Sequence, residues 1–234
     1  MGCLCADMSG PGMVVSPACI GHLWVFKDLQ REELAAVATA ATRRRYQRGA
    51  AIFRQGDPAK QMSLIKAGRV RLSKLTENGI ETTLDVRKAG DFLGENMLIE
   101  NADFPVSAWC IEDSLICGFT KESFERLVLD HPKIGLQVIK NLSTRIAWLT
   151  ERIGSMSLTH LEDRLYRVLV NVAREHGVRD KNSLMIQFPL THEDLSFLVG
   201  AHRVSITRAL KSLTESGKIS RRGKTVSVLL AEGV

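Results

Sequence analysis

The stretch HEDLSFLVGAHRVSITRALKSLTESGKISRRGKTVSVLL, residues 192–230, changes from helical spacing to strand-like alternation just after Gly217. Gly200 divides its first part into two short helices, because glycine supplies the tight turn between them. The second helix is predicted from about Arg203 to Glu215 and has three apolar side chains on one face, namely Ile206, Leu210 and Leu213. The pattern predicts a helix-turn-helix followed by a wing.

The other face of the second predicted helix carries residue types that suit DNA, namely Arg203, Val204, Thr207, Arg208 and Lys211. An arginine on a helix in the major groove can hold guanine O6 and N7 by two hydrogen bonds. Residues 218–220 and 225–229 are predicted to pair around a basic loop that contains Arg221, Arg222 and Lys224. Such side chains suit phosphates. The alternative, a charged face that contacts only water, leaves the glycine turn and the basic hairpin unexplained.

The charge of the chain favours an acidic partner such as nucleic acid. Its 234 residues carry a formal net charge of +6, with a pI near 9.2. The last forty residues hold seven Lys and Arg side chains against two acidic ones, so most of the excess lies in this segment. Glycine and proline interrupt the uncharged stretch 8–26, so we expect a cytoplasmic protein without a membrane segment.

A strand-rich region precedes the long central helix. Helical spacing from Leu29 to Ala41 predicts a first helix, which the Arg43–Arg45 run and Gly49 close. Short apolar pieces separated by turn glycines follow and predict a small antiparallel barrel or roll: 51–53, 62–65, 70–75, 82–86, 106–111 and 115–119.

The central helix has apolar residues at alternating steps of three and four: Ile139, Leu142, Ile146, Leu149, Ile153 and Met156. This a/d spacing places them along one line, which favours a dimer in which two such helices bury each other's faces. A helix packed on its own roll is the alternative, and it would show a broader apolar stripe.

Together these features resemble the CRP/FNR family of bacterial transcription regulators over nearly the whole chain. The matching motifs are GDFLGE (90–95), SAW (107–109), the central helix, LTHEDLSFLVGAHRVSITRALKSL (190–213) and GKTVSV (223–228). The resemblance implies an α+β fold with an N-terminal, cyclic-nucleotide-binding-like antiparallel β-roll, a long dimerisation helix and a C-terminal winged helix-turn-helix. The corresponding ranges are a cysteine-containing tail at 1–22, the roll at 23–130, the dimerisation helix at 131–157 and the DNA-binding domain at 158–234.

The resemblance also implies function and partners. It implies a homodimeric, non-enzymatic regulator that binds double-stranded DNA at an inverted repeat and works with RNA polymerase. The base-reading surface would consist of Arg203, Val204, Ser205, Thr207 and Arg208. An enzyme is disfavoured by the motifs as well, since HEDLS has Ser196 where a zinc protease needs its second histidine.

The resemblance places the effector pocket at Gly94, Glu95, Val106 and Ser107. Cyclic-nucleotide binders of the family have an arginine directly before this serine to hold the phosphate, and here that residue is Val106. A small organic effector is an alternative, in a pocket lined by Leu64, Val70, Leu84, Met97 and Leu98, although such residues are also typical of a core.

The five cysteines leave several redox hypotheses open. Cys3, Cys5, Cys19 and Cys117 give the four thiolates of an iron–sulfur cluster, as in the oxygen-sensing branch of the family, but their spacing differs from that branch. A disulfide switch between the tail and Cys110 or Cys117, or a structural role for Cys117 in the core, fits equally. Haem on His22 or His160 is a further option, and so is a basic redox or metal-binding module without specific DNA binding.

Overall fold

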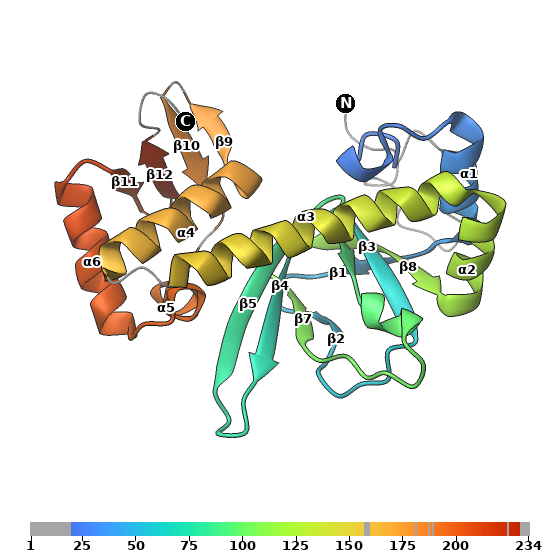
Figure 1. The fold of residues 1–234 in the computed structure, drawn as a ribbon, viewed down its shortest axis with the longest axis horizontal. Coiled ribbons are helices and arrows are strands. Elements are labelled where there is room, and N and C mark those ends of the chain that lie inside the picture. Colours follow the sequence, from blue (N-terminus) through green and yellow to red (C-terminus); the bar gives the residue numbers. More distant parts are fainter. Residues whose placement is uncertain are drawn as a thin grey trace. The chain divides into compact units, whose positions relative to one another are not determined.

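A computed structural model of the chain describes residues 20–156, 160–180, 182–186, 188, 190–223 and 225–229 (Figure 1). The chain divides into two compact units, one formed by residues 1–81 and 85–145 and the other by residues 82–84 and 146–234. The predicted α+β fold is confirmed, with β-sheets in the first unit and a helical bundle with a small sheet in the second. None of the described helices has the length and apolar character needed to cross a membrane.

The first unit is a roll made of two four-stranded sheets, whose recorded strand pairs are antiparallel. The first sheet has the order β1-β8-β3-β6, with β1 at Thr42–Tyr46, β8 at Ser114–Thr120, β3 at Gln61–Ala67 and β6 at Phe92–Leu93. The second has the order β2-β7-β4-β5, with β2 at Ala51–Phe53, β7 at Ser107–Cys110, β4 at Arg69–Leu75 and β5 at Glu81–Lys88. All six strands predicted from the glycine-separated pieces are present.

Two buried apolar clusters hold the roll together. The larger one joins β3 and β8 to the helices α1 (Arg31–Ala40), α2 (Lys121–Asp130) and the start of α3 (Pro132–Met156). Figure 1 shows α1 and α2 beside the first turns of α3. The smaller cluster lies between the sheets and includes Phe53 stacked on Phe104 with ring centroids 3.9 Å apart. Short 3-10 helices at Trp24–Phe26 (η2) and Glu95–Leu98 (η3) complete the unit.

The arginine run expected to close the first helix is instead a strand. Helix α1 ends at Ala40, and residues 42–46 form β1, which pairs with β8. The Nη2 atom of Arg43 donates to the carbonyl oxygen of Ala38 at 2.6 Å, so the arginine satisfies one of the last carbonyls of α1 from the strand. The expectation failed because a distant strand, β8, decides the conformation of this run.

Helix α3 has 25 residues and two different faces. The face toward the roll buries Ile134, Gln137, Val138, Asn141 and Arg145. The other face leaves large apolar side chains exposed, namely Leu136, Ile139, Ile146, Leu149 and Ile153. Leu142 was expected on the exposed face, but it packs against the core of the roll. The side chain of Met156 lies outside the described residues.

A buried charge network fixes α3 to the roll. Arg145, only 5% exposed, places Nη2 2.6 Å from Asp91 Oδ2 and Nη1 3.7 Å from Asp85 Oδ2. Asp85 Oδ2 also forms an ion pair with Arg87, whose Nε lies 2.6 Å away, and Arg87 Nη1 lies 3.9 Å from Glu95 Oε1. Removing one partner from such a network leaves an uncompensated buried charge, at a typical cost of about 3–5 kcal/mol. These contacts therefore hold α3 in one rotation about its axis.

The second unit packs three helices on a four-stranded sheet. The helices are α4 (Leu161–His176), α5 (His192–Val199) and α6 (Arg203–Glu215). The sheet has the order β11-β12-β10-β9, with β11 at Ile219–Arg222, β12 at Thr225–Leu229, β10 at Ser183–Ile186 and β9 at Val178–Asp180. The buried side chains between them include Leu165, Leu169, Leu195, Leu198, Ile206, Leu210, Leu213 and Val228.

Candidate nucleic-acid interface

A glycine turn sets the angle between α5 and α6. Gly200 has φ +67°, the left-handed conformation that favours glycine, and the N–H of Ala201 donates to Ser196 O at 2.9 Å. At the other end of α5, Asp194 N donates to Thr191 Oγ1 at 3.0 Å and Asp194 Oδ2 accepts from Thr191 N at 3.0 Å. Both ends of α5 are therefore fixed locally, and α6 begins at a defined place.

Three inward side chains determine which face of α6 meets solvent. Ile206, Leu210 and Leu213 are each at most 1% exposed. Because a helix turns by about 100° per residue, the predicted DNA-binding residues must then point outward. Arg203, Val204, Thr207, Arg208 and Lys211 are exposed, and Ser205 is half-buried. The exposed fraction of Val204 is 65%, so this valine does not belong to the core.

Two basic side chains of the wing lie in a strand and not in the loop between the strands. We expected Arg221 and Arg222 between the strands, but both belong to β11, opposite Val226 and Thr225 of β12. Strand pairing thus continues to the tip, where Gly223 has φ +60°. Lys224, also predicted to bind DNA, lies outside the described residues.

Figure 1 shows α6 and the β11–β12 hairpin within the same unit, and the two elements are in contact. Within the described part of the chain, no ion pair joins an acidic side chain to Arg203, Arg208, Arg221 or Arg222. Lys211 differs, since its Nζ lies 3.7 Å from Glu215 with both side chains exposed. Guanidinium groups that form no ion pair with a carboxylate are available to bind phosphates or base edges.

One residue of this surface was not predicted. His192, at the start of α5, places Nδ1 3.0 Å from Thr207 Oγ1 on α6 and Nε2 3.3 Å from Arg221 Nη2 on β11. Burial and then the charges of Arg221 and Arg203 lower the pKa of His192 below its ordinary value of 6.5. The only sequence signal was a histidine inside the motif, because the partners lie 15 and 29 residues further along the chain.

The predicted effector residues of the roll are largely engaged with other protein groups. Glu95 faces Arg87, Ser107 Oγ accepts from Gln55 N at 3.0 Å, and Val106 packs against the smaller core cluster. Gly94 has φ +79°, and a Cβ added there would lie 2.8 Å from Gln61 O. The backbone conformation and the close packing at Gly94 thus both require glycine, whatever the roll binds.

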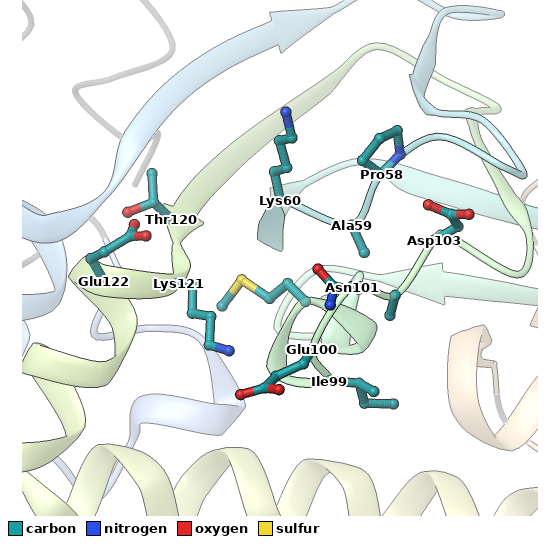
Figure 2. Close-up of a pocket in the computed structure, with 12 residues that line it drawn as sticks. Pro58, Ala59, Lys60, Ile99, Glu100, Asn101, Asp103, Thr120, Lys121 and Glu122 are labelled. Atoms are coloured by element: carbon teal, nitrogen blue, oxygen red, sulfur yellow. The ribbon is translucent and has the colours of Figure 1, made fainter.

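The apolar residues suggested as an effector-pocket lining lie in different places. Leu64 and Met97 are buried in the larger cluster, Val70 is buried in the smaller one, and Leu98 is exposed. An open surface pocket of about 700 Å³ lies on the roll, and of these suggested residues only Met97 lines it (Figure 2). Its lining mixes both charge signs with apolar groups and includes Lys60, Met97, Ile99, Glu100, Lys121 and Glu122. None of the four predicted effector residues lines it.

The two described cysteines are buried in different places. Cys117 belongs to the larger cluster and is 2% exposed, whereas Cys110 belongs to the smaller cluster, where burial raises the pKa of its thiol. Cys3, Cys5 and Cys19 lie outside the described residues. His22 and His160, suggested as haem ligands, are exposed. In the described part of the chain, no group of three or more His, Cys, Asp or Glu side chains could hold a metal ion.

Comparison with known proteins matches both units. Residues 43–131 match the cyclic nucleotide-binding domain, and residues 163–233 match the Crp-like helix-turn-helix domain. The chain belongs to the CRP/FNR family of transcription regulators. Regulators of this family are not enzymes, and CRP-family proteins are homodimers. The Crp-like helix-turn-helix of this chain is therefore a DNA-binding element of an effector-sensing regulator.

Several CRP/FNR relatives are similar to the chain at low identity. The anaerobic regulatory protein of Bacillus subtilis is 27% identical over 77% of this chain and 76% of its own length. A CRP-like cAMP-activated global transcriptional regulator of Mycobacterium tuberculosis is 23% identical over 87% of this chain and 91% of its own. The solved structure of the c-di-GMP responsive global regulator CLP of Xanthomonas campestris has a TM-score of 0.72 at 23% identity, covering 86% of this chain and all of that one. These names refer to different signals.

The exposed Val204 generates a prediction about DNA sequence. An apolar side chain suits a thymine methyl and cannot accept a hydrogen bond from cytosine N4, so C opposite Val204 should cost about 1–3 kcal/mol. Selection from random duplexes should therefore return an A·T pair at the position that Val204 faces. Val204→Glu should move the preference at this position toward G·C. Ser212→Glu, an exposed change two turns further along α6, should leave it unchanged. A strict G·C requirement in the unmodified protein would refute this reading of Val204.

Proposed function

We propose that the chain is a homodimeric transcription regulator in which α6 of each subunit reads one half of an inverted repeat in double-stranded DNA. The observation that carries the proposal is the outward face of α6, where Arg203, Thr207 and Arg208 are exposed. Arg221 and Arg222 of the wing supply further positive charge in the same unit. The half-sites should lie about one helical turn of DNA apart, because each α6 enters its own major groove. RNA polymerase is the expected protein partner, in keeping with the family.

The exposed face of α3 supports the dimer. Ile139, Ile146 and Ile153 are seven residues apart, and the last two are 65% and 70% exposed. In a heptad repeat these isoleucines occupy the a positions, and Leu149 occupies a d position. Isoleucine at a with leucine at d favours a pair of parallel helices. An apolar row of this length is unfavourable in water unless a partner covers it. A second copy of α3 presents the complementary row.

We propose that the roll controls DNA binding in response to a signal, and a cyclic nucleotide is not the favoured one. Its phosphate would need a free guanidinium, whereas position 106 is valine. The nearby guanidiniums of Arg87 and Arg145 are paired with Asp85 and Asp91. An anionic effector would have to displace these carboxylates, so a neutral or cationic organic effector fits the roll better.

Redox sensing through Cys117 is the second candidate, and one observation favours it. Cys117 belongs to the same buried cluster as Ile20, the residue next to Cys19. A four-thiolate iron–sulfur cluster would use Cys117 with Cys3, Cys5 and Cys19, and a disulfide switch would use Cys117 with one of them. Cys110 is the less favoured partner for such a switch, because it lies in the other cluster, where burial raises the pKa of its thiol.

The dimer is tested by replacing an apolar residue that the subunit itself leaves exposed. Ile146→Asp should give monomers and weaken operator binding at least tenfold, because a charge would be buried in the helix pair. The fold of the subunit should persist, since Ile146 is not part of its core. Thr144→Asp introduces the same charge on an exposed position of α3 outside the apolar row and should remain dimeric. Light scattering at micromolar concentration measures both, and a monomeric unmodified protein would exclude the dimer.

The redox candidate is tested by comparing operator affinity before and after oxidation. The unmodified protein, purified without oxygen, should lose or gain affinity on oxidation, and Cys117→Ser should abolish that response while keeping the fold. Cys110→Ala is the matched control, and it should keep the response, because the buried thiol of Cys110 has a raised pKa and little thiolate. Equal affinities of the unmodified protein in both states would remove the redox candidate and leave the small-molecule effector.

A further inference from the structure

His192 connects the two elements that are proposed to contact DNA. Its ring stands between Thr207 on the outward face of α6 and Arg221 on β11 of the wing, at 3.0 Å and 3.3 Å. All three residues belong to the second unit, and helix α5, which carries His192, is fixed at both ends. The ring is therefore attached to a locally rigid element.

The partners of the ring determine which nitrogen carries the proton. Thr207 Oγ1 donates its hydrogen to Arg203 O at 3.1 Å, so it accepts from His192 Nδ1. The guanidinium of Arg221 can only donate, so His192 Nε2 must accept from it. Both conditions are met only by a neutral ring protonated at Nδ1. A continuous series of hydrogen bonds then runs from Arg221 through His192 and Thr207 to Arg203 O.

We propose that His192 is a positioning residue for specific DNA binding, whose neutral ring orients Arg221 of the wing relative to Thr207 of α6. Protonation ends this role, because Nε2 then carries a hydrogen and can no longer accept from Arg221. The inference rests on the proposed function, since it concerns how the same surface recognises DNA. A wing and a helix whose side chains are oriented before binding lose less freedom when they bind.

Burial of the ring, and then the charges around it, set the direction of the pH effect. Among the described residues, the charged groups that face it are Arg221 from β11 and Arg203 from α6, and both oppose a positive charge on the ring. On its own helix, the carboxylate of Asp194 accepts from Thr191. The pKa of His192 therefore lies below 6.5, so the ring is neutral at pH 7.5 and gains its charge only in more acidic solution.

Protonation changes specific and non-specific binding in different ways. An added positive charge strengthens attraction to phosphates of any sequence and steepens the salt dependence of binding, by up to about 0.9 in the slope of log K against log salt. Loss of the Arg221 contact removes one hydrogen bond that orients the wing, which should lower the affinity for the operator about fivefold. The ratio of operator affinity to affinity for a scrambled duplex should therefore fall about fivefold when the ring becomes protonated.

Fluorescence anisotropy of the full-length protein with both duplexes, at constant ionic strength from pH 5 to 8, tests the proposal. The operator is the duplex obtained by selection from a random pool. His192→Gln keeps a neutral donor and acceptor and should give a ratio that does not change with pH. His192→Lys carries a permanent charge and should stay at the low ratio with the steeper salt slope. His160→Gln changes an exposed histidine at the start of α4 and should keep the profile of the unmodified protein.

Three results would separate the possible failures. The same pH profile in His192→Gln as in the unmodified protein would overturn the role of His192 while leaving the proposed function intact. A flat profile in the unmodified protein would do the same. Equal affinity for operator and scrambled duplex at every pH would instead contradict the proposed function. Thermal unfolding of each variant shows whether a loss of affinity reflects loss of the fold, which would lower binding to both duplexes at every pH.

Discussion

The buried ion pair between Arg145 and Asp91 fixes how α3 is turned about its own axis. Successive residues of a helix are about 100° apart, so placing Arg145 toward the roll also places Ile134 and Val138 there. Ile139 and Ile146 must then point away from it. The exposed apolar row that we assign to the dimer is therefore a direct consequence of the pairing on the opposite face.

The same reasoning applies within the DNA-binding unit. Ile206, Leu210 and Leu213 fill the core, so the side chains between them are directed to solvent. The turn at Gly200 determines where α6 begins, and the pairing of β11 with β12 carries Arg221 and Arg222 to the tip of the wing. Burial on one side of each element thus sets the chemistry available on the other side.

Much of this arrangement could be predicted from local patterns. The glycine-separated strands, the turn at Gly200 and the inward face of α6 follow from spacing of two or 3.6 residues, which local sequence records directly. Features decided by distant partners could not be predicted. Residues 42–46 form a strand because β8 is available to pair with them, and Leu142 packs on the roll because α3 is held by distant Asp91.

The candidate sites show the same limit. The outward residues of α6 follow from helical geometry, whereas the role of His192 depends on Thr207 and Arg221, which only folding brings to it. In the roll, Leu64 and Val70 have the composition of a pocket lining, yet both are core. Apolar composition alone cannot distinguish these two cases. For the same reason, the chemical nature of the signal is inferred from charged groups and thiols. Arg87 and Arg145 bear on whether the effector is an anion, and Cys117 bears on redox sensing.

The number of chains bound to one duplex shows whether the protein reads an inverted repeat as a dimer. Sedimentation equilibrium should be measured for the full-length protein alone, with a duplex that carries the selected inverted repeat, and with a duplex that carries a single half-site. We expect a dimer in the absence of DNA and two chains per intact repeat, at concentrations where the single half-site remains largely unbound. One chain binding each half-site independently, with equal affinity for both duplexes, would contradict this expectation.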